Sequence, residues 1–121
     1  MRRLEFASLQ VRDLEASKEF YTKKLGFEPL EMSNPAAVVF RYNKGEASFA
    51  IRKPVGNIDG KELGIGNSLW FAIDGAIEEL KAEFEGKDIS ILGGINQTPF
   101  GKTIIVKDPD GYVLTFMQPN K

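Results

Sequence analysis

The sequence predicts an α+β protein made of two βαβββ modules in tandem. The same order of elements, namely a strand, a helix opened by an aspartate, a short strand and a hairpin, occurs twice in the 121 residues. The helix-opening aspartates Asp13 and Asp74 are 61 residues apart, and the hairpin glycines Gly45 and Gly111 are 66 apart. A single α+β sheet with two helices on one face is the alternative arrangement of these elements.

The first module is predicted from a strand at residues 4–11 and the helix signals that follow it. Asp13 is suited to cap the free N–H groups of a helix start, and Gly26 is suited to the left-handed conformation that ends one. Between them, apolar residues recur near helical spacing: Leu14, Phe20, Tyr21 and Leu25. A short strand is expected at residues 27–32, and a hairpin at residues 37–42 and 47–53 around the turn 43–46.

A connector follows at residues 54–66, where one proline and four glycines interrupt any apolar periodicity. We therefore expect one domain over residues 1–121. Its first module covers about residues 1–55, its linker about 56–66, and its second module about 67–121.

The second module repeats the pattern from a strand at residues 68–73. Asp74 is the expected helix cap, and Gly86 the expected helix end. The helix itself is indicated by Ile77, Leu80 and Phe84 at helical spacing. After it we expect a strand at 89–92, a loop at 93–99, and a hairpin at 102–106 and 112–117 around Asp108-Pro109-Asp110-Gly111.

Composition excludes several kinds of chemistry, because the chain has no histidine and no cysteine. Zinc sites of thiolate and imidazole ligands, Ser-His-Asp and Cys-His nucleophiles, and dithiol redox centres all need those residues. A metal would have to be held by oxygen ligands alone, which favours hard cations.

Charge and hydropathy limit the partners. The net charge of −1 argues against a nucleic-acid binder, which usually carries a basic surface. No apolar run approaches the ~18–20 residues that span a bilayer, so no membrane partner is expected. The opening residues 1–6 become polar too soon for a secretory signal, and a cytoplasmic protein is therefore expected.

Several local motifs carry a family resemblance. They are Val11-Arg12-Asp13-Leu14-Glu15-Ala16-Ser17, Phe20-Tyr21, Leu25-Gly26-Phe27-Glu28, Pro99-Phe100-Gly101 and Asp108-Pro109-Asp110-Gly111-Tyr112. Together they resemble the vicinal oxygen chelate superfamily, which includes glyoxalase I, extradiol dioxygenases, fosfomycin-resistance transferases and bleomycin-resistance proteins. The resemblance spans nearly the whole chain. It implies that the two modules form a cupped sheet around a cavity.

The resemblance also implies where metal ligands would stand in metal-dependent members. Those positions correspond here to Phe6, Ala50, Ser68 and Thr115. Phe6 and Ala50 have no donor atom, and neutral hydroxyls are weak ligands for a catalytic divalent ion. We therefore expect a metal-free member of the family, with no cofactor.

Strand alternation predicts which side chains share the cavity face. The expected ligand-binding residues are Phe6, Ser8, Gln10, Arg52, Ser68, Trp70, Thr115 and Met117. Trp70 between small neighbours leaves room for a flat ligand to stack, and Arg52 suits a carboxylate or phosphate. The structural alternatives are that Trp70 fills the cavity or a dimer contact, and that Arg52 reaches solvent. No catalytic residue can be assigned.

The leading hypothesis is metal-independent binding or sequestration of a small molecule, with aromatic and anionic compounds as candidates. A metal-independent enzyme of the same superfamily, an isomerase, lyase or transferase, is the alternative. A regulatory or purely structural module is a third reading. A homodimer is expected, because small members of the family commonly dimerise and because exposed strand edges favour self-association.

Overall fold

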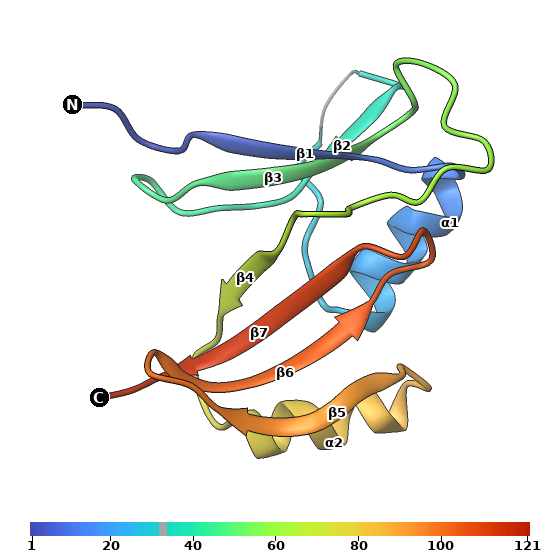
Figure 1. The fold of residues 1–121 in the computed structure, drawn as a ribbon. Coiled ribbons are helices and arrows are strands. Elements are labelled where there is room, and N and C mark those ends of the chain that lie inside the picture. Colours follow the sequence, from blue (N-terminus) through green and yellow to red (C-terminus); the bar gives the residue numbers. More distant parts are fainter. Residues whose placement is uncertain (32–33) are drawn as a thin grey trace. The chain divides into compact units, whose positions relative to one another are not determined.

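The computed structural model describes residues 1–31 and 34–121. The chain divides into two compact units, Met1–Lys61 and Glu62–Lys121. Each unit contains one mixed β-sheet and one main helix (Figure 1). The predicted α+β class and the two βαβββ-type modules are confirmed.

The first unit has a three-stranded sheet in the order β1-β3-β2. Strand β1 is parallel to β3, and β2 is antiparallel to β3. The elements are β1 (Phe6–Gln10), α1 (Leu14–Glu19), the π-helical turn η1 (Phe20–Lys24), β2 (Ala37–Val39) and β3 (Ser48–Arg52).

The ends of the first helical segment follow the sequence signals. Asp13 Oδ1 accepts a hydrogen bond from the Ala16 backbone N–H at 3.1 Å, which satisfies one free donor of the helix start. After η1, Gly26 adopts φ +83°, a conformation that costs a residue with a side chain considerably more. Both predictions are confirmed.

The strand predicted at residues 27–32 is wrong in extent. The structure has only an isolated antiparallel bridge between Pro29 and Phe40, supported by backbone bonds on either side of it. Pro29 has no N–H to donate, and proline interrupts a strand ladder for that reason. Met32, the last residue of that prediction, lies outside the described residues.

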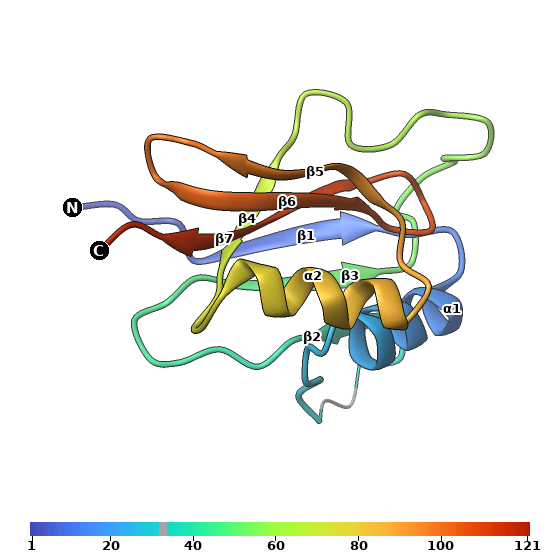
Figure 2. The same ribbon diagram turned by 90° about the horizontal axis from the view of Figure 1, so that it is seen from below.

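The second unit has a four-stranded sheet in the order β4-β7-β6-β5. Strand β4 is parallel to β7, and the other neighbours are antiparallel. The elements are β4 (Leu69–Ala72), α2 (Ile77–Gly86), β5 (Ile91–Gln97), β6 (Gly101–Lys107) and β7 (Val113–Pro119), with α2 a regular helix of several turns (Figure 2). In both units, the first strand is therefore parallel to the last.

Helix α2 is capped differently from the prediction. Its N-cap position is Ala76, which makes no side-chain cap, and Asp74 lies outside the helix start. The Ile77 N–H instead donates to Oε1 of Gln118 at 2.9 Å. The expected cap at Asp74 is wrong because Gly75, at φ +99°, redirects the chain between that aspartate and the helix.

In the second unit, the helix end predicted at Gly86 is confirmed, and the loop predicted at Gly93 and Gly94 is corrected. Gly86 is the last helical residue, and the left-handed residue after the helix is Asp88 at φ +61°. Gly93 and Gly94 lie inside β5, at φ +85° and +129°, where the pairing register shifts. Most of the expected strand at 89–92 and loop at 93–99 is thus one bulged strand, β5, because a bulge accommodates left-handed residues within a ladder.

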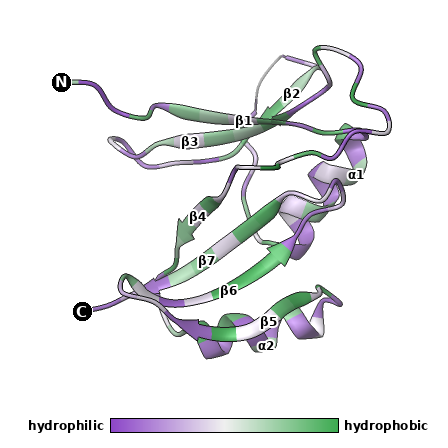
Figure 3. Ribbon diagram, viewed as in Figure 1, coloured by the Kyte–Doolittle hydropathy of each residue, from purple (hydrophilic) through white to green (hydrophobic). Residues whose placement is uncertain are grey.

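The core of each unit lies between its sheet and its helix. In the first unit, the buried Tyr21 ring lies 5.6 Å from Phe40 and 5.8 Å from Phe49. In the second, Phe116 contacts Phe84 of α2 edge-on at 5.2 Å and stacks on Phe71 at 5.4 Å. Figure 3 shows the hydrophobic stretches of the strands in green and the mixed polarity of α2.

The outer surface of α2 carries its charged groups. Lys102 of β6 donates to Oε2 of Glu78 at 3.3 Å. Two hydrogen bonds lower the pKa of the Glu78 carboxyl. The larger effect comes from the backbone N–H of Glu78 itself, and the smaller effect comes from the Lys102 ammonium. None of the described helices is long and apolar enough to cross a membrane.

Candidate functional site

Each sheet has one face against its helix and one face turned away from it, here called the open face. In the first unit, Phe49 faces the aromatic core, as do its same-face neighbours Leu9 and Ile51. Because side chains alternate along a strand, the open face carries Phe6, Ser8, Gln10, Ser48, Ala50 and Arg52. This is the face assignment predicted from the sequence.

The second unit follows the same rule. Phe71 and Phe116 face α2, so Trp70 and Ala72 of β4 and Thr115 and Met117 of β7 lie on the open face. Ser68 precedes β4 and shares the side of Trp70, because the two side chains are hydrogen-bonded. The open faces of the two units therefore hold all eight predicted ligand-binding residues, four in each unit.

Exposure on the open faces is uneven. Phe6 is 47% exposed. Ala50 and Thr115 are buried, and both are small side chains in a strand with neighbours on either side. Thr115, for example, lies between Trp70 and Ile105 in the register of the sheet. The Thr115 hydroxyl therefore lies at the bottom of the second open face, whereas the Trp70 side chain is much more exposed to solvent.

On the second open face, Trp70 makes both a side-chain hydrogen bond and an aromatic contact. Its indole Nε1–H donates to Oγ of Ser68 at 2.8 Å. Its ring meets Phe100 edge-to-face, with centroids 6.2 Å apart and planes at 90°. The two residues are nevertheless 47% and 66% exposed, so the corner that their rings form is open to solvent.

Phe100 was not among the residues predicted to bind a ligand. Its motif, Pro99-Phe100-Gly101, was noticed only as part of the family resemblance. Phe100 lies in the turn between β5 and β6, so the alternation of strand residues could not identify it. An aromatic residue in a short polar turn was the signal that could have found it.

Two polar residues of the first open face have structural partners. Gln10 Oε1 accepts the Val55 backbone N–H at 2.9 Å, which holds the segment after β3. Arg52 Nε donates to the carbonyl of its neighbour Lys53 at 3.1 Å. These bonds orient both side chains. Whether they also contact a ligand stays a prediction.

The residues at the family's metal-ligand positions do not fit a metal. Phe6 and Ala50 lie on one open face, and Ser68 and Thr115 on the other, without a carboxylate among the four. No group of three or more aspartates and glutamates that could hold an ion occurs within residues 1–31 and 34–121.

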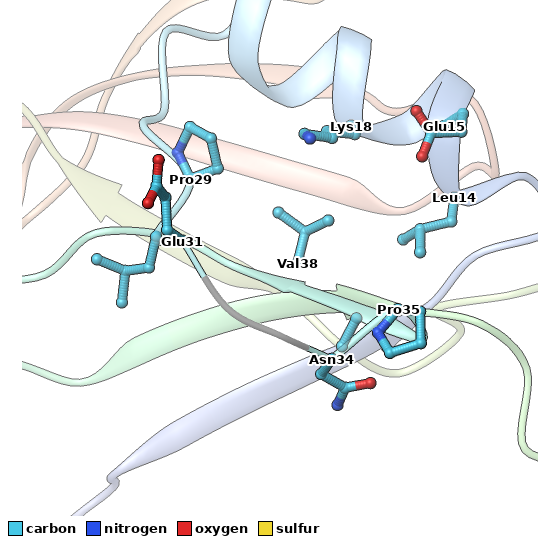
Figure 4. A pocket seen from close by; sticks show the side chains of 10 residues that line it. Leu14, Glu15, Lys18, Pro29, Glu31, Asn34, Pro35 and Val38 are labelled. Atoms are coloured by element: carbon cyan, nitrogen blue, oxygen red, sulfur yellow. The ribbon is translucent and has the colours of Figure 1, made fainter.

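Two pockets of the first unit lie away from these residues. A pocket of about 810 Å³ is lined by Leu14, Glu15, Lys18, Pro29, Leu30, Glu31, Asn34, Pro35, Ala37 and Val38. Figure 4 shows Val38 near the middle of the pocket, Leu14 to one side of it, and the charged Glu15 and Lys18 on the helix above. A second hollow of about 610 Å³ adjoins it near Arg12 and Lys53. Neither pocket includes a residue of the predicted site.

Comparison with known proteins identifies the family. Residues 3–116 match the family model of the Glyoxalase/Bleomycin resistance protein/Dioxygenase superfamily. The chain belongs to this superfamily. No protein of curated function matches the chain in sequence.

Several solved structures have a similar fold. TnmS3, an antibiotic-binding protein from Streptomyces sp. CB03234, matches with a TM-score of 0.79 at 20% identity, covering 99% of this chain and 98% of its own. A lactoylglutathione lyase from Agrobacterium tumefaciens matches at 0.73 and 17% identity, covering 98% and 94%. An integron cassette protein from the mobile metagenome of V. cholerae matches at 0.74 and 18%, covering 98% and 95%. Because a binding protein and an enzyme share this fold, the site residues must decide the function.

Proposed function

We propose that this superfamily member binds a small planar aromatic molecule without a metal. The observation that carries the proposal is the exposed corner formed by Trp70 and Phe100. Exposed aromatic rings that are already fixed at an angle to one another offer both a stacking face and an edge contact. The Ser68 hydroxyl holds the indole in place, so little ordering is needed when a ligand arrives.

The charge of the second open face favours a neutral or anionic ligand. Its strand positions carry no aspartate or glutamate, whereas Lys107 of β6, which lies opposite Val113 on that face, supplies positive charge. An ammonium group attracts a carboxylate or phosphate. A cationic ligand would meet no counter-charge on these strands.

The similarity to TnmS3 supports binding as the activity. That protein is described as an antibiotic-binding protein, and its fold matches nearly all of this chain. At 20% identity the similarity carries the fold, and the proposal itself rests on the Trp70 corner. We also propose that the protein acts as a homodimer, which sedimentation equilibrium tests directly.

The first prediction concerns binding of 2-naphthoate, a planar aromatic anion. Trp70 is the only tryptophan, so its fluorescence should be quenched saturably by 2-naphthoate and much less by the non-planar decahydro-2-naphthoate. EDTA should leave the titration unchanged. Calorimetry should show affinity for 2-naphthoate weakened about three- to tenfold by Trp70→Ala, in line with an aromatic pair worth about 0.5–1.5 kcal/mol.

The matched control is Tyr42→Ala, which removes an aromatic ring of equal exposure in the other unit. Its affinity should equal that of the wild type. Equal affinity for both naphthoates, or an affinity that Trp70→Ala leaves intact, would rule out the stacking site. One equivalent of a transition metal in the purified protein would contradict metal independence.

A further inference from the structure

The turn that carries Phe100 is held more firmly than its exposure suggests. The Thr98 backbone N–H donates to the Gly101 carbonyl at 2.9 Å, and the Gly101 N–H donates to the Thr98 carbonyl at 3.3 Å. The Thr98 hydroxyl donates to the Gly101 carbonyl at 2.7 Å and accepts the Phe100 N–H at 3.2 Å. These bonds lie within residues 98–101 and stabilise the turn without any other element.

Asn120 holds the same turn from outside. Its side-chain Nδ2 donates to the Pro99 carbonyl at 3.0 Å, and its backbone N–H donates to the Phe100 carbonyl at 3.0 Å. Gln97 Nε2 in turn donates to Asn120 Oδ1 at 3.4 Å. Both carbonyl groups that flank the Phe100 α-carbon therefore accept hydrogen bonds from one residue.

The base of the turn has no room to shift. Gly101 lies so close to β7 that a Cβ atom there would be 2.1 Å from the Gln118 carbonyl oxygen. The strand that follows Phe100 is thus in direct backbone contact with the strand that leads to Asn120. Since the base is fixed, the orientation of Phe100 depends on the bonds at the tip of the turn.

We propose that Asn120 is a positioning residue that holds Phe100 at a right angle to Trp70 and so preforms the corner for a planar aromatic ligand. This inference rests on the proposed function. An exposed phenyl ring on an untethered turn would have to be ordered at the moment of binding, which lowers affinity. Asn120 removes that cost, although its own side chain need not touch the ligand.

The test measures Trp70 quenching by acrylamide together with 2-naphthoate affinity by calorimetry. Asn120→Ala removes the side-chain bond to the Pro99 carbonyl but keeps the backbone bond to the Phe100 carbonyl, so the Stern–Volmer constant should rise part of the way towards that of Phe100→Ala. Affinity for 2-naphthoate should fall by up to about threefold, less than the roughly tenfold upper limit for complete loss of an aromatic contact. Asn57→Ala, which removes the asparagine that accepts the Asp59 N–H in another turn, should change neither quantity.

A double-mutant cycle separates positioning from general stabilisation. If Asn120 acts through Phe100, adding Asn120→Ala to Phe100→Ala should weaken binding no further. An equal additional loss in that background would overturn the inference, as would unchanged quenching in Asn120→Ala. Asn120→Asp, which lacks the donor to Pro99 but keeps the size of the side chain, should behave like Asn120→Ala and guards against an unfolded variant.

The proposed ligand class and the role of Asn120 can be contradicted separately. A wild-type protein that binds no 2-naphthoate contradicts the proposed ligand class, while the acrylamide experiment still decides whether Asn120 positions Phe100. A wild-type protein that binds normally, with Asn120→Ala unchanged in both assays, contradicts only the role of Asn120.

Discussion

Single residues in this protein are predictable when their partners are close in sequence. Asp13 accepts the N–H of Ala16, three positions away, and the rule for helix caps found it. The cap of α2 comes from Gln118, 41 positions from Ile77, and no local rule could find it. Trp70 could be predicted because it lies in a strand with alternating faces, whereas its ring partner Phe100 lies in a turn, to which that rule does not apply.

The cap of α2 gives a prediction at this scale. Gln118→Ala removes the acceptor of the part-buried Ile77 N–H and should lower the free energy of unfolding by about 1 kcal/mol. Asp74→Ala should lower it by less than about 0.5 kcal/mol, because Asp74 does not cap the helix. Urea denaturation measures both. A larger loss from Asp74→Ala than from Gln118→Ala would restore the sequence-based assignment.

Periodicity in the sequence predicts the helices and strands, but not the residues at which several of them begin and end. The alternation of apolar residues gave the correct faces of β1, β3, β4 and β7 because it reflects which side packs on a helix. Several ends depend on glycines, and the sequence alone does not show which backbone angles a glycine adopts. Gly93 and Gly94 suggested a loop but form a bulge within β5.

Helix α2 ends at Gly86 as predicted, but its left-handed residue is not that glycine. The Ile89 N–H bonds the Phe84 carbonyl at 3.0 Å and the Asp88 N–H bonds the Glu85 carbonyl at 3.3 Å. This pair of bonds is the Schellman arrangement, in which the residue after the C-cap is left-handed and usually glycine. Here that residue is Asp88, at φ +61°.

Replacing Asp88 tests the cost of this conformation. Asp88→Gly should raise the free energy of unfolding by about 0.5–1 kcal/mol, because glycine adopts positive φ without steric strain. Asp88→Ala removes the same carboxylate but keeps a Cβ atom, so it should leave stability equal to the wild type or lower. Thermal unfolding compares the three proteins. Equal gains in both variants would mean that charge, and not backbone strain, sets the stability here.

At the scale of the whole molecule, the connector at residues 54–66 was predicted only as a stretch without periodicity. The structure fastens its first part to the first unit, where Gln10 holds Val55 and the Arg12 guanidinium donates to the carbonyls of Ile58 and Lys61. Its last part belongs to the second unit, where Gly64 lies so close to Tyr112 that a Cβ atom would be 2.6 Å from the ring. Such contacts join residues distant in sequence, so composition could not reveal them.

The stretch left between these attachments, around Glu62 and Leu63, is where local opening should expose the chain to a protease. Arg12→Ala frees the segment that precedes it, and losing these exposed hydrogen bonds should favour opening by about 1 kcal/mol, or roughly fivefold. Cleavage after Glu62 by a glutamate-specific protease, followed by mass spectrometry, should therefore be about fivefold faster than in the wild type. Arg41→Ala, which breaks the exposed ion pair with Glu28, should leave that rate unchanged. Equal rates in Arg12→Ala and the wild type would mean that Arg12 contributes nothing to the order of the connector.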